Sequence, residues 1–417
     1  MSKSPAILVL WLLSITTVTA QSDMGTWFTR TPLPTARQEM PHVLLNDKIY
    51  VLGGIDASRN SIEFVEAYDP QTGTWEDIAS LPPTLHHLGA AVANGKLYVL
   101  GGYISGFTPT DRVFEFDPGT QEWTEKNPMP AAQGAHAAVS IDNKIYIVGG
   151  ERGREALNTN QMYDPITDTW TARAPLPTAR EHLAATVLDG KIYVIGGRRL
   201  SDGALDNLGT VEIYDPATDS WDRSAASLPR TSGGLAAAAL HGRVYAFGGE
   251  FFGAQSGVLN MTAEYNPEQN TWRELAPMPV PRHGMGAVAV ADTIFIIGGG
   301  PAAGFATSSL NSGFVPPKPA PTTIEDEQVL TEPFSLSYGF PNPTHSTTTF
   351  HLTLSQPEQV KFTIYDALGR ETETLINRYL NLGTHQFEWD AGGQVSGLYF
   401  GRIVVGDVMI TRTLVKR

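Results

Sequence analysis

The sequence predicts an all-β protein, in which a six-bladed β-propeller closed by the N-terminal strand precedes a small C-terminal β-sandwich. Three observations carry this prediction. Six glycine doublets recur about every 50 residues, five aromatic residues each precede a tryptophan by seven positions, and residues 334–417 alternate in a strand pattern without that repeat. With 41 glycines, 29 prolines and no cysteine in 417 residues, the composition is that of a turn-rich β protein without disulfides.

The glycine doublets each end an apolar run rich in Ile, Val and Tyr, and they lie 48, 48, 47, 52 and 50 residues apart. A two-residue turn, such as Asn46-Asp47 or Asn94-Gly95, separates this run from an earlier apolar stretch, so the two form a hairpin. Glycine at the end of the hairpin lets backbones approach where a Cβ would clash. The doublets are Gly53-Gly54, Gly101-Gly102, Gly149-Gly150, Gly196-Gly197, Gly248-Gly249 and Gly298-Gly299.

The second half of each repeat places an aromatic residue and a tryptophan around an Asp-Pro or Asn-Pro turn, as in Tyr68-Asp69-Pro70 before Trp75. Five copies on strand ends favour packing between blades over a stacking site for sugars or bases. The sixth repeat lacks its own tryptophan, and Trp27 stands one period before Trp75. The N-terminal strand is therefore expected to close the ring and remove a free edge. The repeat tryptophans are Trp27, Trp75, Trp123, Trp170, Trp221 and Trp272.

The doublet with Tyr and Trp at fixed offsets resembles the kelch repeat family over about residues 24–312. We assign the propeller to residues 21–312. Residues 1–20 have a basic start at Lys3, a short apolar run and small residues before Gln21, which is the order of a cleaved signal peptide. The apolar run is too short to span a bilayer, so an N-terminal anchor is the weaker reading.

Residues 313–333 are rich in proline and then acidic, which predicts an inter-domain linker. Residues 334–417 carry turn signals and about seven short strands, which predicts a β-sandwich. This tail resembles the type A sorting domain of the type IX secretion system in elements such as Ile364-Tyr365-Asp366, Trp389-Asp390 and Ser396-Gly397. The resemblance implies that residues 334–417 engage the type IX machinery and that the protein is secreted or attached to the bacterial outer surface. A plain adhesive tail is the alternative.

Candidate ligand-binding residues lie on the variable loop face of the propeller, because its loops differ between blades. Arg37, Arg180 and Arg282 occupy equivalent positions after a Leu-Pro or Met-Pro pair, and converging arginines are suited to an anionic ligand. A structural role in bonding neighbouring loops is the alternative. Arg198 follows one glycine doublet, and Glu151 and Glu250 follow two others. With Arg154 and Arg199 close by in the sequence, these three residues predict a mixed-charge pocket, in which Glu151 and Glu250 are the catalytic candidates, or else solvated ion pairs.

Histidines 86, 87, 136, 182 and 283 lie near the starts of first strands, but no shared register is evident between them and no carboxylate recurs beside them. We therefore predict no metal site and no cofactor. The net charge of −14, without a basic run, gives no footprint for nucleic acid, and nothing after the signal peptide predicts a transmembrane helix.

The leading hypothesis is an exported binding module that takes a protein or carbohydrate ligand on the loop face. The alternative is a sugar-acid (sialate-type) mutarotase or epimerase, since some exported kelch propellers isomerise sialic acid. Such an enzyme needs Glu151 or Glu250 beside Arg180 or Arg198. A structural or adhesive surface protein is a further alternative, and the ligand stays unnamed.

Overall fold

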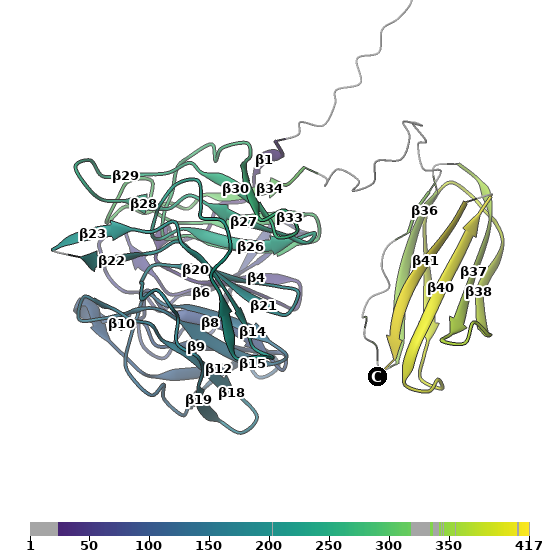
Figure 1. The fold of residues 1–417 in the computed structure, drawn as a ribbon, viewed down its shortest axis with the longest axis horizontal. Helices are drawn as coiled ribbons and strands as arrows, with labels where there is room; N and C mark the ends of the chain where they lie inside the picture. Colours follow the sequence, from purple (N-terminus) through teal and green to yellow (C-terminus); the bar gives the residue numbers. More distant parts are fainter. Residues whose placement is uncertain are drawn as a thin grey trace, which may run out of the picture. The chain divides into compact units, whose positions relative to one another are not determined.

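The computed structural model describes residues 24–317 except 202, residues 334–336, 342 and 344, and residues 346–416 except 355 and 407. It divides into two compact units, Met1–Ala320 and Pro321–Arg417 (Figure 1). The expected signal peptide, residues 1–20, and most of the expected linker lie outside the described residues. No helix in the described part of the chain is both long enough and apolar enough to cross a bilayer.

The described residues of the first unit form six antiparallel sheets of four strands, and we call each sheet with its connections a blade. The first three blades are β3 (His42–Leu45), β4 (Lys48–Leu52), β6 (Val65–Asp69) and β7 (Thr74–Ile78); β8 (Gly89–Ala93), β9 (Lys96–Leu100), β12 (Val113–Asp117) and β13 (Glu122–Lys126); and β14 (Ala137–Ile141), β15 (Lys144–Val148), β18 (Asn160–Asp164) and β19 (Thr169–Ala172). The next three are β20 (Ala184–Leu188), β21 (Lys191–Ile195), β24 (Val211–Asp215) and β25 (Ser220–Asp222); β26 (Ala236–Leu240), β27 (Arg243–Phe247), β30 (Thr262–Asn266) and β31 (Thr271–Glu274); and β32 (Gly286–Val290), β33 (Thr293–Ile297), β34 (Asn311–Val315) and β1 (Thr26–Thr29).

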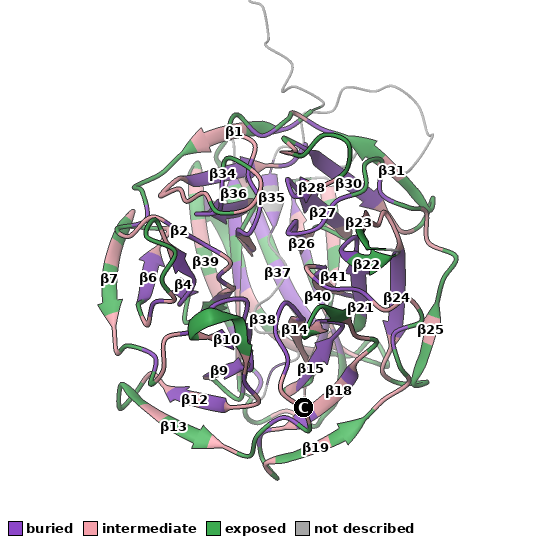
Figure 2. Cartoon of the chain, turned by 90° about the vertical axis from the view of Figure 1, so that its left-hand side faces the viewer, coloured by how far each residue is buried: buried purple, intermediate pink, exposed green. Residues whose placement is uncertain are grey.

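The blades stand around a ring, with the second strand of each blade buried and the fourth strand forming the rim (Figure 2). Among the described residues, short hairpins fill the connection between the second and third strands of four blades. Because these insertions differ in length, they make one face of the propeller variable. They are β10 (Tyr103–Ile104) with β11 (Thr108–Pro109) around the 3₁₀ turn η1 (Ser105–Phe107), β16 (Glu151–Arg152) with β17 (Glu155–Ala156), β22 (Arg198–Ser201) with β23 (Ala204–Asn207), and β28 (Glu250–Phe251) with β29 (Gly257–Val258). In the first blade, β5 (Ile55–Asp56) of this connection pairs with β2 (Arg37–Gln38), which precedes the first strand of the blade.

The ring is closed by the N-terminal strand. Strand β1 pairs with β34 in the last blade, with Trp27 opposite Phe314. The Trp27 indole N–H also donates to the Ala276 carbonyl at 2.7 Å, and its ring contacts Phe247 and Phe314. The all-β fold and its closure strand are thus as the sequence predicts.

The glycine doublets join each blade to the next. All twelve glycines have positive φ, and the N–H of the second glycine donates to a carbonyl of the following blade at 2.8–2.9 Å, as Gly102 does to Gln133. A Cβ on Gly101 would lie 2.8 Å from that same carbonyl oxygen. The doublet is therefore required by both the backbone conformation and the close approach of the next blade.

The tryptophans of the rim make a second set of inter-blade contacts. In each of the six blades the indole N–H donates to a backbone carbonyl of the preceding blade, at distances between 2.7 and 3.3 Å. In five of these blades the aromatic residue seven positions earlier packs on the indole, with Tyr68 and Trp75 at 5.0 Å between ring centroids. These contacts are structural, which is the interpretation that the repeated pattern favours.

Where the structure describes it, the second unit is a sandwich of a three-stranded and a four-stranded sheet. Its core contains Phe350, Phe362 and the fully buried Trp389. The strands are β35 (Phe334–Leu336), β36 (Thr347–Leu354) and β39 (Gly383–Asp390) in one sheet, and β38 (Glu371–Leu380), β37 (Glu358–Asp366), β40 (Gly397–Val405) and β41 (Val408–Lys416) in the other.

A glycine on the axis of the propeller makes room for a histidine of the neighbouring blade. A Cβ built on Gly286 in β32 would collide with the His42 ring on β3, and the φ of Gly286 lies outside the left-handed region. We expect Gly286→Ala to lower the free energy of unfolding by about 1–3 kcal/mol through overpacking. Adding His42→Ala should restore most of the loss. A double-mutant cycle by urea unfolding tests this pair, and additive effects would contradict it.

Candidate functional site

The three arginines that the sequence nominated as ligand-binding residues are buried inside their blades rather than converging on the axis. Arg37 is 0% exposed, forms an ion pair with Glu66 and donates to the Val51 carbonyl. Arg180 is also 0% exposed and pairs with Glu212 at 2.5 Å. Both glutamates lie on the third strand of the same blade, so these contacts hold adjacent strands together. The geometry favours the structural alternative for these arginines.

Arg282 occupies the same place in the last blade but has Ser312 where the other two blades have glutamate. Its guanidinium donates to Ser312 Oγ at 3.0 Å and to the carbonyls of Gly298 and Leu310 at 2.8 and 3.1 Å. Burial lowers the pKa of Arg282 to about 10. This arginine, too, is engaged within its own blade.

In every blade, the residue two positions after the one equivalent to Arg37 belongs to a closed ring of backbone hydrogen bonds around the axis. Each ring residue donates its N–H to the carbonyl of the ring residue in the preceding blade, and the bond from Glu39 to Gly284 closes the circle. The six bonds measure 2.7–3.0 Å, and all six residues have φ between 49° and 63°. We call these residues the axial ring: Glu39, His87, Ala135, His182, Gly234 and Gly284.

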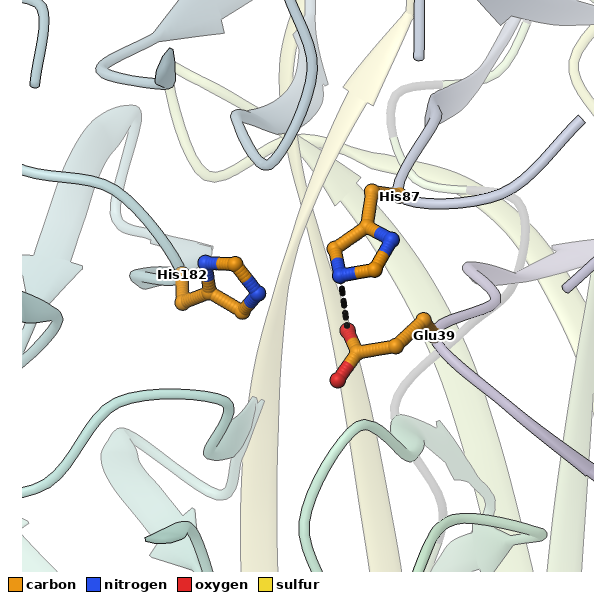
Figure 3. Close-up of side chains that lie close together, drawn as sticks. All are labelled: Glu39, His87 and His182. Atoms are coloured by element: carbon orange, nitrogen blue, oxygen red, sulfur yellow. Dashed lines mark ion pairs between the residues drawn. The ribbon is translucent and has the colours of Figure 1, made fainter. Parts of the chain in front are cut away.

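Three side chains of the axial ring gather at one point. Figure 3 shows Glu39, His87 and His182 with a ring nitrogen of each histidine pointing toward the carboxylate. His87 Nε2 lies 3.4 Å from Glu39 Oε2, and the two imidazole centroids are 4.8 Å apart. One ligand atom from each of the three residues falls within 4.8 Å of the others, so the donor set matches that of a metal site.

A charged network adjoins this cluster. Arg198 Nε donates to Glu181 Oε1 at 2.8 Å, and its Nη1 donates to Glu250 Oε1 at 2.5 Å. Glu250 Oε2 accepts from the Gly304 N–H at 2.8 Å and lies 3.4 Å from His283 Nε2. Among the described residues, Arg198 is therefore held between two buried carboxylates.

Burial changes the protonation of these groups. Burial, together with the nearby Glu250 carboxylate, raises the pKa of Glu39 to about 8, and Arg198 partly opposes this shift. Burial lowers the pKa of His87 and of His182 well below the ordinary value, and it also lowers the pKa of His283. The imidazoles are thus neutral at pH 7, with a lone pair on one nitrogen of each.

A cavity of about 200 Å³ opens above the axial ring on the variable face. Phe107 and Phe305 lie at its rim, about half exposed, with ring centroids 6.2 Å apart. Arg198 stacks over Phe252 at 5.1 Å. We call this cavity the mouth pocket, and its lining residues are Gln38, Glu39, Ile55, His87, Phe107, Glu151, His182, Arg198, Glu250, Phe252, Gly304 and Phe305.

The mouth pocket brings together some of the residues that the sequence nominated. Glu151, Glu250 and Arg198 line it, whereas Arg180 is in the blade interior. Glu151 accepts a hydrogen bond from the backbone N–H of Arg154 at 2.7 Å. Glu250 accepts hydrogen bonds from the Arg198 guanidinium and from the backbone N–H of Gly304.

The interpretation of the histidines needs correction in one respect. His87 and His182 do share a position in the repeat, because each stands two residues after the residue that is equivalent to Arg37 in its own blade. Glu39 occupies the same position in the first blade and supplies a carboxylate. Sequence reasoning missed this because it counted from strand starts rather than from the arginine position. His86, His136 and His283 stand at other positions of the repeat.

Comparison with known proteins agrees with this architecture. The family model described as the KLHDC2/KLHL20/DRC7 Kelch-repeats domain matches residues 8–175 and 90–299. A solved structure titled YjhT is similar with a TM-score of 0.59 and 17% identity, over 68% of this chain and 95% of that one. At that identity the likeness shows the fold alone.

The curated relatives align only in part. Kelch-like ECH-associated protein 1B of Danio rerio is 36% identical over 95 residues, which are 22% of this chain and 16% of the relative. Kelch-like protein terF of Aspergillus terreus is 31% identical over 113 residues, 27% of this chain and 25% of the relative. The chain thus aligns with a quarter or less of these proteins.

The tail has a match of its own. A model described as the Secretion system C-terminal sorting domain matches residues 339–417. This match indicates export by type IX secretion to the cell surface or outside. Since the repeat model matches well over half of the chain, the protein belongs to the kelch-repeat family.

Proposed function

We propose that this exported propeller is a binding module that takes a protein ligand at its mouth pocket. The observation that carries the proposal is the pair of half-exposed phenylalanines, Phe107 and Phe305, above a floor of buried charged groups. Exposed aromatic side chains around a desolvated pocket are typical of the residues that dominate protein–protein binding. The cavity has room for one inserted side chain of a partner, and the variable loops around it supply specificity.

The alternative is sugar-acid isomerisation in the same pocket. Glu151 and Glu250 beside Arg198 favour it, because an acid–base group and a carboxylate-binding cation lie in one cavity. However, Arg198 already binds the carboxylates of Glu181 and Glu250, and a ligand carboxylate would compete with both. The binding role therefore has the stronger support.

Crosslinking tests the proposal. A photo-crosslinking amino acid at position 305 of the full chain, exposed to surface proteins of the producing cells, is expected to yield one dominant product. The product should fall at least tenfold when Phe107→Ser is added. The matched control is Ile166→Ser, which changes a 76% exposed apolar residue in the turn between β18 and β19.

Two results would contradict the binding proposal. Crosslinking that Phe107→Ser leaves unchanged would place the partner elsewhere. Interconversion of sialic-acid anomers that is lost in Glu151→Gln, with crosslinking absent in both proteins, would establish the enzymatic alternative.

A further inference from the structure

We propose that Glu39, His87 and His182 form a binding site for one divalent transition-metal ion, of which Zn²⁺ is the representative, on the axis of the propeller. Two imidazoles and one carboxylate form the donor set that Zn²⁺ and its neighbours prefer. The proposal goes beyond the binding function and does not depend on the nature of the ligand.

The geometry of the three side chains matches such an ion. Two ligands about 2.0–2.1 Å from a tetrahedral Zn²⁺ are about 3.3 Å apart. The distance between His87 Nε2 and Glu39 Oε2 is 3.4 Å, and all three donor atoms fall within 4.8 Å. Small rotations of the His182 side chain close the remaining gap, because its free ring nitrogen already points toward the carboxylate (Figure 3).

The backbone holds the three residues in place before any ion binds. They come from three different blades, and the closed hydrogen-bond circle of the axial ring fixes their positions. Their positive φ is unfavourable for residues with a Cβ, and glycine stands at the corresponding positions 234 and 284. Side chains kept in a strained backbone conformation are typical of functional sites.

His87 has an outer partner that orients its ring, which is a second feature of natural metal sites. His86 Nδ1 lies 2.5 Å from His87 Nδ1, so Nε2 of His87 is left for the ion, as in sites where the other nitrogen of a metal-bound histidine is held by a neighbouring group. The carboxylate of Glu181 lies directly beside His182 Nδ1, with no hydrogen bond between the two atoms.

The charges facing the site also suit a divalent cation. Glu181 and Glu250 both bind the guanidinium of Arg198, so these three groups carry one negative charge in excess. They are almost fully removed from water, where unbalanced charge is costly. A divalent ion that replaces the proton of Glu39 balances this excess together with the charge of the Glu39 carboxylate.

The site faces the mouth pocket, because all three ligands line its floor. With three protein ligands, a tetrahedral ion keeps one coordination position free for water or for an oxygen atom of a bound molecule. A metal ion bound here would therefore present an electrophilic centre at the bottom of the mouth pocket.

A neighbouring set competes for the same ion and allows a sharp control. His283 Nε2 lies 3.7 Å from Glu39 Oε1 and 3.4 Å from Glu250 Oε2, so Glu39, Glu250 and His283 also satisfy the distance condition. However, both ring nitrogens of His283 lie 3.1 Å from the carbonyls of Gly300 and Gly304, and Glu250 is engaged by Arg198. His87 and His182 are therefore the ligands, and His283 is not.

The test uses the untagged exported chain, stripped with a chelator and then dialysed against Zn²⁺. We expect about one Zn²⁺ per chain by elemental analysis, and a visible Co²⁺ spectrum of tetrahedral type when Co²⁺ replaces it. The double variant His87→Gly/His182→Gly should lose both signals, with at least a hundredfold weaker binding. Glycine is chosen because it already occupies two positions of the axial ring, so the fold is retained.

His283→Ala and His136→Ala are the controls, and both should bind Zn²⁺ as the parent does. Zn²⁺ should also raise the melting temperature of the parent and of the controls but not that of the double variant. Three outcomes would overturn the proposal: no stoichiometric Zn²⁺ in the parent, equal uptake by the double variant, or a loss of binding in His283→Ala.

Discussion

Replacing Arg180 with alanine is expected to lower the free energy of unfolding of the propeller by about 3–5 kcal/mol. The guanidinium pairs with Glu212 at 2.5 Å, and the two side chains are 0% and 1% exposed. Removing the arginine leaves the Glu212 carboxylate buried without its main counter-charge, and Arg223, the other cation near it, has a 67% exposed side chain. Urea unfolding of the full chain, followed by tryptophan fluorescence, measures the change.

The matched control is Arg199→Ala, because Arg199 pairs with Asp206 in an exposed position at 3.3 Å. That variant should change stability by about 0.5 kcal/mol or less. A double replacement of Arg180 and Glu212 by apolar residues of similar size should recover much of the loss. A destabilisation below about 1 kcal/mol for Arg180→Ala, together with loss of ligand capture, would instead show that Arg180 acts in binding.

A chain that begins at Thr31 is expected to lose the closed propeller. Removing strand β1 leaves β34 as an unpaired edge and deletes the Trp27 ring from its contacts with Phe247 and Phe314. Exposed edges pair with other chains, so the truncated protein should melt more than 10 °C lower and form dimers or aggregates. Light scattering after gel filtration and a thermal melt measure both effects.

The control for this truncation is a chain that begins at Met24, which retains the whole strand and should behave as the parent does. A synthetic peptide of residues 24–30 added to the shorter chain should restore the monomer and part of the melting temperature, because it can occupy the vacant edge as an added strand. A stable monomer without the peptide would contradict the role of β1 in closure.

The repeat architecture could be predicted from the sequence because each signal is local and recurs. The doublet of Gly101 and Gly102 is forced by positive φ and by the carbonyl of the next blade, so no other residue type serves there. The offset of Trp27 from Trp75 likewise predicts closure, since only a strand from the other end of the chain completes the last sheet.

The candidate site could be predicted only in part from the sequence. The sequence placed Arg37, Arg180 and Arg282 at equivalent positions, but it did not show whether an arginine there points to the axis or back between two strands. The orientation is decided by a partner on the third strand of each blade, which is Glu66, Glu212 or Ser312 for the three arginines in turn. Such a pairing depends on strand register, which the repeat signals leave open.

The sequence by itself thus determined the number and order of the repeats, the closure strand and the sorting tail, because these rest on local backbone requirements and recurrent spacing. Only the tertiary structure decided that Glu39, His87 and His182 meet on the axis. They are separated by 48 and 95 residues, and the closed circle of backbone hydrogen bonds brings one residue from each blade to the same centre.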